Sequence, residues 1–208
     1  MGNKVILVGG FHEIIELCED CGLEIVGIID SKLKGKYEGV DIIGTDDDRF
    51  ELFKKYGDIP LVLTPDKPEI REKLYHLYKD AGFCFKTIVS PRSRISRTAT
   101  IGEGTIIQDS VNVSSHTKIG DFVKLNTMSN VMHDCVVGNF TTIAPNVCVL
   151  GRIGIGEKCY IGANATVLPD VKIVGGTTVG AGATVLRTIE EPGVYIGTPT
   201  KLLKKDKI

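Results

Sequence analysis

His133 and Asp134 form an ionisable pair inside an otherwise small and aliphatic stretch, NTMSNVMHDCVVGNF, at residues 126–140. An imidazole titrates near neutral pH and can take a proton from an attacking nucleophile, while a neighbouring carboxylate can orient the ring and stabilise its charged form. The pair could therefore act as a general base with a supporting acid. A solvated His–Asp pair on an exposed turn is the simpler alternative, so the surrounding sequence has to be considered.

A period of six residues runs through this region. Counting from Ile95 in steps of six, all sixteen positions up to Val185 are Ile, Val or Leu. Small residues such as Ala99 recur two positions earlier, and glycine often follows the aliphatic residue. This period fits neither an ordinary strand nor a helix, but it fits the short strand and tight turn of a parallel β-helix. Three repeats make one three-sided coil that advances by about 4.8 Å, so residues 91–186 form about five coils without a long inserted loop.

The segment before this repeat alternates strand-like and helix-like patterns. Buried strands are predicted over residues 4–10, 23–30, 59–65 and 84–91, and helices over residues 11–22, 46–57 and 68–82. Alternation with short connections predicts a small parallel α/β domain. We therefore predict two domains, residues 1–90 and residues 91–208, the second including a C-terminal tail.

Composition excludes several other classes of protein. The net charge is −1, so nothing favours a nucleic-acid partner. No apolar run approaches the length of a membrane span and no signal-peptide pattern is present, so we expect a cytoplasmic chain without membrane insertion. Cys18 and Cys21 form the only C-x-x-C motif among six cysteines, which argues against zinc and for reduced thiols.

Four motifs carry a family resemblance: NTMSNVMHDCVVGNF, IGANATVLPDV, VGAGATV and GVYIGTPTKLL. They resemble the left-handed β-helix acyltransferases. With the α/β domain included, the whole chain resembles bacterial sugar acetyltransferases, namely the nucleotide-linked 4-amino-sugar N-acetyltransferases and the related sialic acid O-acetyltransferases. This resemblance implies a Rossmann-like N-terminal domain for the nucleotide-sugar and an all-β, left-handed parallel β-helix for catalysis.

The resemblance also implies roles for individual residues. His133 would be the general base, and Asp134 would raise its basicity. Acetyl-CoA would be the acyl donor, bound without a metal along the β-helix wall between subunits. The matching positions are small residues and one terminal lysine: Thr142, Gly151, Ala163, Ala181 and Lys201. At Thr142 the sequence departs from the family, which often has histidine there.

The acceptor is expected in the first domain. The family's glycine-rich loop is replaced by the shorter VGGFHE, in which His12 would take the place of the loop histidine. The expected contacts follow the ends of three strands: Gly10, Phe11, His12, Asp30, Ser31, Thr64 and Pro65. NAD is not expected, because G-x-G-x-x-G is absent. A zinc site is not expected either, because the repeat region offers only His116 beside His133.

These observations predict an acetyl-CoA-dependent N-acetyltransferase acting on a nucleotide-activated amino sugar, such as a UDP- or GDP-linked 4-amino-deoxysugar. The resemblance further implies a homotrimer with three sites at subunit interfaces. Two alternatives remain open: O-acetylation of sialic acid or a related sugar by the same residues, and a non-catalytic scaffold that binds a nucleotide-sugar.

Overall fold

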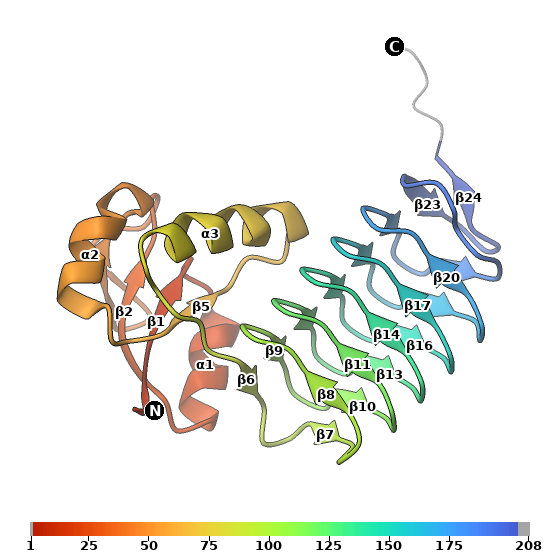
Figure 1. The fold of residues 1–208 in the computed structure, drawn as a ribbon, viewed down its shortest axis with the longest axis horizontal. Coiled ribbons are helices and arrows are strands. Elements are labelled where there is room, and N and C mark those ends of the chain that lie inside the picture. The colour runs from red at the N-terminus through yellow and green to blue at the C-terminus, as the bar shows by residue number, and fades with distance from the viewer. Residues whose placement is uncertain (1, 204–208) are drawn as a thin grey trace, which may run out of the picture.

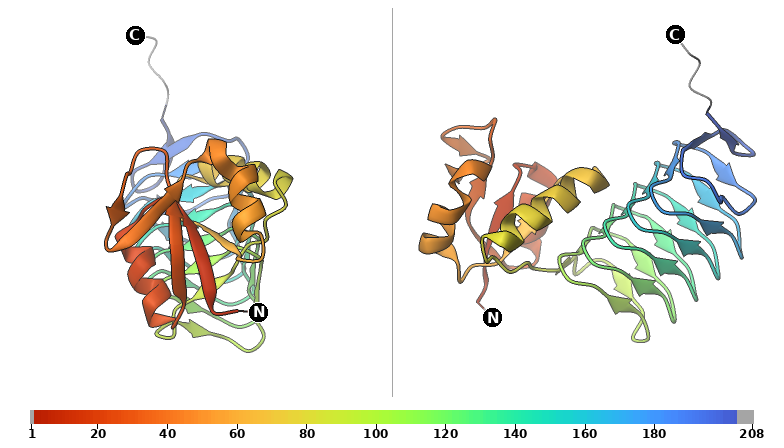
Figure 2. Two further views of the ribbon diagram at one scale, coloured as in Figure 1. Left: turned by 90° about the vertical axis from the view of Figure 1, so that its left-hand side faces the viewer. Right: turned by 45° about the horizontal axis from the view of Figure 1, so that its top comes forward.

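The computed structural model describes residues 2–203 and shows an α/β unit joined to a regular stack of coils (Figure 1). The α/β unit lies at the N-terminal end of the stack, and α3 extends from it alongside the first coils (Figure 2). No helix in the described part of the chain is both long and apolar enough to cross a membrane.

The α/β unit is built around one five-stranded sheet with the order β3-β4-β2-β1-β5. All neighbouring strands in it are parallel except β3 and β4, which form an antiparallel hairpin. In chain order the elements are β1 (Lys4–Val8), α1 (His12–Asp20), β2 (Glu24–Ile29), β3 (Lys36–Tyr37), β4 (Val40–Gly44), the 3-10 helix η1 (Asp46–Asp48), α2 (Arg49–Tyr56), β5 (Leu61–Leu63) and α3 (Pro68–Asp80). The predicted parallel α/β pattern is confirmed for the first three strands and the three helices, although η1 forms the start of the predicted second helix.

Two parts of this unit differ from the sequence prediction. The β3–β4 hairpin was not predicted. The predicted fourth strand over residues 84–91 was wrong as a single element, because it is divided between two sheets. Phe85 forms one bridge to Leu61 at the edge of the α/β sheet, whereas β6 (Ile88–Val89) pairs with β9 in the stack of coils. The coil stack therefore begins with β6.

The six-residue period produces sixteen two-residue strands in the stack. Each aliphatic repeat position is the second residue of its strand, and each strand from β7 to β19 pairs in parallel with the strand 18 residues further on, as Val131 pairs with Val149. Strands β7 to β22 begin at Arg94 and end at Val185: β7 (Arg94–Ile95), β8 (Thr100–Ile101), β9 (Ile106–Ile107), β10 (Asn112–Val113), β11 (Lys118–Ile119), β12 (Lys124–Leu125), β13 (Asn130–Val131), β14 (Val136–Val137), β15 (Thr142–Ile143), β16 (Cys148–Val149), β17 (Gly154–Ile155), β18 (Tyr160–Ile161), β19 (Thr166–Val167), β20 (Lys172–Ile173), β21 (Thr178–Val179) and β22 (Thr184–Val185). The repeat residues from Ile107 onward are buried and form one continuous core.

These strands form three parallel sheets, which are the three sides of each coil. The six-stranded sheet runs β22-β19-β16-β13-β10-β7, and the five-stranded stack sheet runs β20-β17-β14-β11-β8. The eight-stranded sheet contains β21, β18, β15, β12, β9 and β6, and it is extended by β23 (Val194–Ile196) and β24 (Lys201–Leu202). The predicted parallel β-helix is thereby confirmed in its sheet architecture.

The corners of the coils use recurring turn geometry. Non-glycine residues with positive φ recur every six residues from Ser110 to Asp170, including Asp134 with φ 59°. Several of the hydroxyl and thiol side chains that immediately precede a strand bond across the coil; for example, the Thr141 hydroxyl donates to the Gly156 carbonyl at 2.8 Å.

The α/β unit is held on the eight-stranded sheet by a buried arginine. Arg71 on α3 is 1% exposed. Its guanidinium donates to the carbonyls of Phe122 at 2.8 Å and Phe140 at 2.6 Å in the stack, and of Pro65 at 2.7 Å in its own unit. Beside it, the stacked rings of Phe122 and Phe140 contact Tyr75 of α3. These contacts fix how the α/β unit faces the coils.

Shortening a repeat residue tests the stacked core. Ile143→Val is expected to lower the free energy of unfolding by about 1 kcal/mol, because it removes one methylene from a fully buried site. Denaturant unfolding of both proteins at the same concentration would measure it. Val136→Ala alters an outward side chain that is 50% exposed and should cost less. Equal costs would mean that the repeat residues do not form a close-packed core.

Candidate functional site

His133 and Asp134 lie on the corner between β13 and β14. The His133 Nδ1 and the Asp134 Oδ2 are 2.8 Å apart, and the two side chains are 47% and 51% exposed. The backbone N–H of Asp134 donates to the Ser115 carbonyl one coil earlier at 2.9 Å, which fixes the base of the turn. With Nδ1 facing the carboxylate, Nε2 is the nitrogen left for a substrate, and it has no hydrogen-bond partner in residues 2–203.

The ring of His133 lies directly against Gly151 in the next coil. A Cβ atom at Gly151 would stand 2.7 Å from both Cε1 and Nε2 of the imidazole. The His133 carbonyl also accepts from the Arg152 N–H at 3.0 Å. Glycine at position 151 is therefore what allows the ring to lie along the corner, with one edge on Asp134 and the other free.

The expected acyl-donor residues are placed in four different environments, of which Gly151 beside His133 is one. Ala163 is half-buried and Ala181 is exposed at the same corner of successive coils, where the Gly182 N–H donates to the Ala163 carbonyl at 2.8 Å. Lys201 is exposed on β24 and lines a hollow with Pro199 and Leu202. The structure thus brings Ala163 and Ala181 together on an accessible wall of small residues.

Thr142 does not share that wall. It is fully buried on β15, where its hydroxyl donates to the Asp66 carbonyl at 2.6 Å and accepts from Arg71 at 3.0 Å. The sequence could not show this burial, because the covering residues come from the α/β unit. Thr142 therefore presents no free hydroxyl at the surface of the chain.

The His–Asp corner and the alanine corner are different edges of the prism. His133 follows β13 of the six-stranded sheet and precedes β14 of the five-stranded stack sheet. Ala163 follows β18 of the eight-stranded sheet and precedes β19 of the six-stranded sheet. Within one chain, the two corners therefore border opposite edges of the six-stranded sheet.

Most of the expected acceptor residues line two adjoining pockets at the ends of the parallel strands. Gly9 and Asp30 line both pockets. One, of about 250 Å³, is also lined by Gly10, Phe11, Thr64, Pro65 and Asp66; the other, of about 260 Å³, is also lined by Val8, Ile29, Ser31, Lys32, Asp46, Ile70 and Leu74. His12 is exposed and lines neither pocket, because it begins α1 beyond the glycine turn. Asp66 was missed by the sequence analysis.

The Asp30 carboxylate ties the pocket's loops together. It accepts from the backbone N–H groups of Gly10 at 3.0 Å, Lys32 at 2.8 Å and Leu33 at 3.0 Å. Partial burial acts to raise the pKa of Asp30, but these three donors outweigh it and hold the pKa below the ordinary 3.8. A charged Asp30 therefore stabilises the folded pocket.

The lowered pKa of Asp30 predicts a pH-dependent stability difference. Because the pKa is lower in the folded state, this stabilisation is present above pH 3.8 and is lost as the pH falls through the lowered value. Asp30→Asn is expected to cost about 1 kcal/mol at pH 7, and its midpoint of thermal unfolding should approach that of the wild type below pH 3.8. Asp80→Asn, at an exposed position, is the matched control. A difference that persists unchanged at low pH would contradict the prediction.

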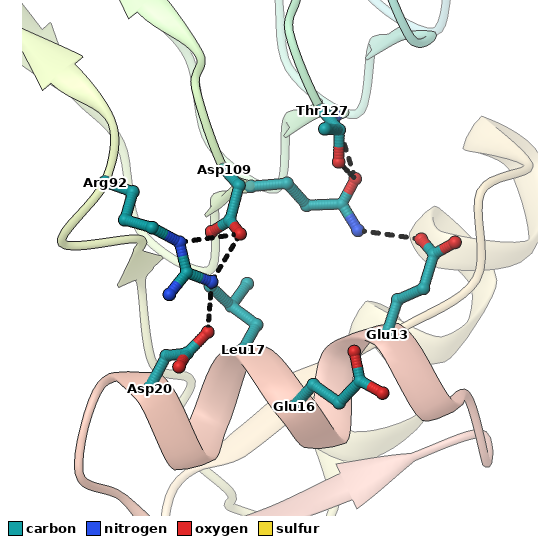
Figure 3. A pocket seen from close by; sticks show the side chains of 8 residues that line it. Glu13, Glu16, Leu17, Asp20, Arg92, Asp109 and Thr127 are labelled. Carbon is teal, nitrogen blue, oxygen red and sulfur yellow. Dashed lines mark hydrogen bonds and ion pairs between the residues drawn. The ribbon is translucent and has the colours of Figure 1, made fainter.

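A further cleft separates α1 from the first coils (Figure 3). Glu13, Glu16 and Asp20 of α1 line the cleft, and Arg92 bridges the carboxylates of Asp20 and Asp109. Hydrogen bonds to Asp20 and then to Asp109 raise the pKa of Arg92. The Gln108 side-chain amide donates from Nε2 to the Glu13 Oε2 at 3.1 Å, and its Oε1 accepts from the Thr127 N–H at 3.0 Å. These contacts join α1 to the first coils, so the cleft is a second junction between the α/β unit and the stack.

Other residues considered in the sequence lie apart from these pockets. His116 is exposed on the corner one coil before Asp134, with φ 58°. Burial raises the pKa of the Cys18 thiol to about 12. In the part of the chain that the structure describes, no group of three or more His, Cys, Asp or Glu residues could hold a metal ion.

The fold resembles one class of protein, the left-handed β-helix sugar acetyltransferases, and comparison with solved structures confirms the resemblance that the motifs predicted. A histidine-to-alanine variant of GDP-perosamine N-acetyltransferase from Caulobacter crescentus, in complex with CoA and GDP-perosamine, is 28% identical, with 97% of each chain covered and a TM-score of 0.92. The acetyltransferase domain of PglB from Neisseria gonorrhoeae, in complex with acetyl coenzyme A, is 27% identical, with 98% of this chain and 100% of that chain covered and a TM-score of 0.91. WeeI from Acinetobacter baumannii is 28% identical, with 96% and 99% covered and a TM-score of 0.86. No protein-family model and no curated protein matches the sequence.

Proposed function

We propose that this chain is an acetyl-CoA-dependent N-acetyltransferase that acetylates the amine of a nucleotide-activated amino sugar, a UDP- or GDP-linked 4-amino-deoxysugar. One observation carries the proposal: an exposed imidazole lies 2.8 Å from a carboxylate on a β-helix corner, in a chain that matches a GDP-perosamine N-acetyltransferase over 97% of its length. In this proposal the stack of coils is left-handed and the α/β unit is a Rossmann-like domain for the nucleotide-sugar.

The chemistry assigned to the corner is proton transfer. Acetyl-CoA supplies the thioester carbonyl that the amine attacks, with the CoA thiolate as leaving group. His133 accepts the amine proton on Nε2, because its Nδ1 faces the Asp134 carboxylate. Asp134 keeps the ring in this orientation and stabilises the imidazolium that forms. The Gly151 backbone, held against the ring, is a candidate donor to the developing oxyanion.

The geometry favours a site completed by a second copy of the chain. The small-residue wall at Ala163 and Ala181 and the base at His133 border opposite edges of the six-stranded sheet, so one chain cannot present both to one thioester. The outward residues of that sheet are mostly small and uncharged: Asn112, Asn130, Cys148, Thr166 and Thr184, with Arg94 on the first coil. The five-stranded stack sheet carries Lys118 and Lys172 instead. We therefore assign the six-stranded sheet to the centre of a homotrimer with three sites.

The acceptor pocket points to the same arrangement. Its residues belong to the α/β unit, which Arg71 holds against the eight-stranded sheet, the side of the coil that does not border His133. In a trimer the pocket of one copy would serve the His133 of a neighbour. Sedimentation of the purified chain should give three times the chain mass of 22.5 kDa. A monomer that turns over substrate would contradict the shared site.

Activity is tested with three acceptors in parallel. Purified chain and acetyl-CoA are incubated with a GDP-linked 4-amino-6-deoxysugar, with its UDP-linked counterpart, or with free sialic acid, and products are followed by mass spectrometry. A mass gain of one acetyl group on a nucleotide-linked amine supports the proposal. Acetylation of sialic acid alone would indicate the O-acetyltransferase. No product, together with no acetyl-CoA binding by calorimetry, would indicate a non-catalytic scaffold.

A further inference from the structure

Lys124 is a buried cation that crosses from the β-helix into the α/β unit. It occupies the outward position of β12 in the eight-stranded sheet, yet its side chain is only 1% exposed. Its Nζ donates to the Thr64 carbonyl at 2.9 Å and lies 2.8 Å from the Asp66 Oδ1. The same ammonium lies 4.9 Å from the centre of the Phe11 ring. Its three contacts thus belong to two different loops of the α/β unit.

All three contacted residues line the same pocket. Phe11, Thr64 and Asp66 line the smaller acceptor pocket, together with the glycine turn. Lys124 lies behind that lining and joins the loop after β1 to the loop after β5. The β-helix therefore contributes to a pocket whose visible walls all come from the other unit.

Asp66 differs from Lys124 in its access to solvent. Its side chain is 45% exposed, and its Oδ1 carries the contact with Lys124 and a long contact, 3.5 Å, with the Asn126 amide. Its Oδ2 has no hydrogen-bond partner in residues 2–203. Burial lowers the pKa of Lys124, and the nearby Asp66 carboxylate opposes that change. The pair thus leaves one carboxylate oxygen available at the pocket.

The opposite charges of Lys124 and Asp66 give the pair a role beside the pocket. A lone carboxylate beside a site for a nucleoside diphosphate would repel the ligand, because like charges at close range repel each other. A buried ammonium 2.8 Å away makes the pair neutral overall. The remaining oxygen can then accept a hydrogen bond from a hydroxyl or N–H group without opposing the phosphates.

We propose that Lys124 is a positioning residue for the acceptor and that Asp66, held and neutralised by it, accepts a hydrogen bond from a hydroxyl or N–H group of the nucleotide-sugar. The inference rests on the proposed function and adds a specificity-determining residue to that pocket. It also makes acceptor binding dependent on the docking of the two units, because the cation comes from the coils.

The test separates acceptor binding from donor binding. Lys124→Met keeps the length of the side chain and removes the charge. It is expected to raise KM for the nucleotide-sugar about tenfold, with KM for acetyl-CoA unchanged. Lys118→Met is the matched control, because Lys118 holds the same repeat position on β11 but is exposed on the neighbouring sheet. The control should leave both constants unchanged.

A double variant distinguishes charge compensation from simple packing. Asp66→Asn removes the carboxylate that Lys124 neutralises, so adding it to Lys124→Met should lower the acceptor KM again, whereas a packing defect would persist or worsen.

If Lys124→Met does not fold, the single variant Asp66→Asn decides the question: a several-fold rise in acceptor KM supports the inference, and no change overturns it. A wild type that acetylates the nucleotide-sugar, with an unchanged KM in Lys124→Met, would overturn this inference alone. A wild type without any acetyl transfer would overturn the proposed function as well.

Discussion

Replacing His133 with alanine is expected to lower turnover about 100-fold or more, with the oligomeric state and acetyl-CoA binding unchanged. The imidazole is about half exposed, and its one side-chain hydrogen bond in the described chain is to Asp134, so removing it creates no core cavity. What is lost is the group that we propose takes the proton from the attacking amine. Steady-state kinetics, sedimentation and calorimetry with CoA would together measure the effect.

Two companion variants identify the source of that loss. Asp134→Asn should lower turnover less than His133→Ala, because the base remains but its charged form loses the carboxylate. His116→Ala removes an exposed imidazole from the corner one coil earlier and should leave turnover unchanged. If His133→Ala retained full turnover, another group would have to take the proton, and the role proposed for the pair would be wrong.

Adding a single methyl group at Gly151 is expected to reduce turnover about 100-fold, the cost of displacing a catalytic group by about 1 Å. The new Cβ would stand 2.7 Å from two atoms of the His133 ring, so the ring must leave its place beside Asp134. Gly151 does not have positive φ, so alanine is compatible with its backbone conformation. Kinetics of Gly151→Ala beside the wild type, with thermal unfolding of both, would check the effect.

Gly154→Ala provides the matched control for this steric prediction. Gly154 lies three residues further along the same coil, and a Cβ there meets its nearest neighbour, Lys172 Cγ, only at 3.8 Å. That variant should retain turnover. If Gly151→Ala were as active as Gly154→Ala, the ring position seen against Gly151 would not be the position that catalysis requires.

The sequence predicted where the two pockets of the α/β unit lie, but not all of the residues that line them. Strand-end residues such as Asp30 and Thr64 do line the two pockets, because the carboxyl ends of parallel strands meet at one edge of a sheet. His12 does not line them, since the short loop leaves it as the first residue of α1. Nothing in the sequence marked Asp66 or Lys124, whose pairing joins residues 58 positions apart across the two units.

The sequence by itself determined the β-helix and the corner that carries His133 and Asp134. A period of six is a local rule: each repeat buries one aliphatic residue and exposes its corner, and the coil of 18 residues brings Gly151 next to His133. Only the tertiary structure decided the fate of the outward residues on the eight-stranded sheet. Lys124 and Thr142 occupy positions whose counterparts on the other two sheets are exposed or half-buried, and they are buried because Arg71 and the aromatic residues of α3 hold the α/β unit over them. Burial of that kind depends on which surfaces meet, and the repeat pattern carries no information about that.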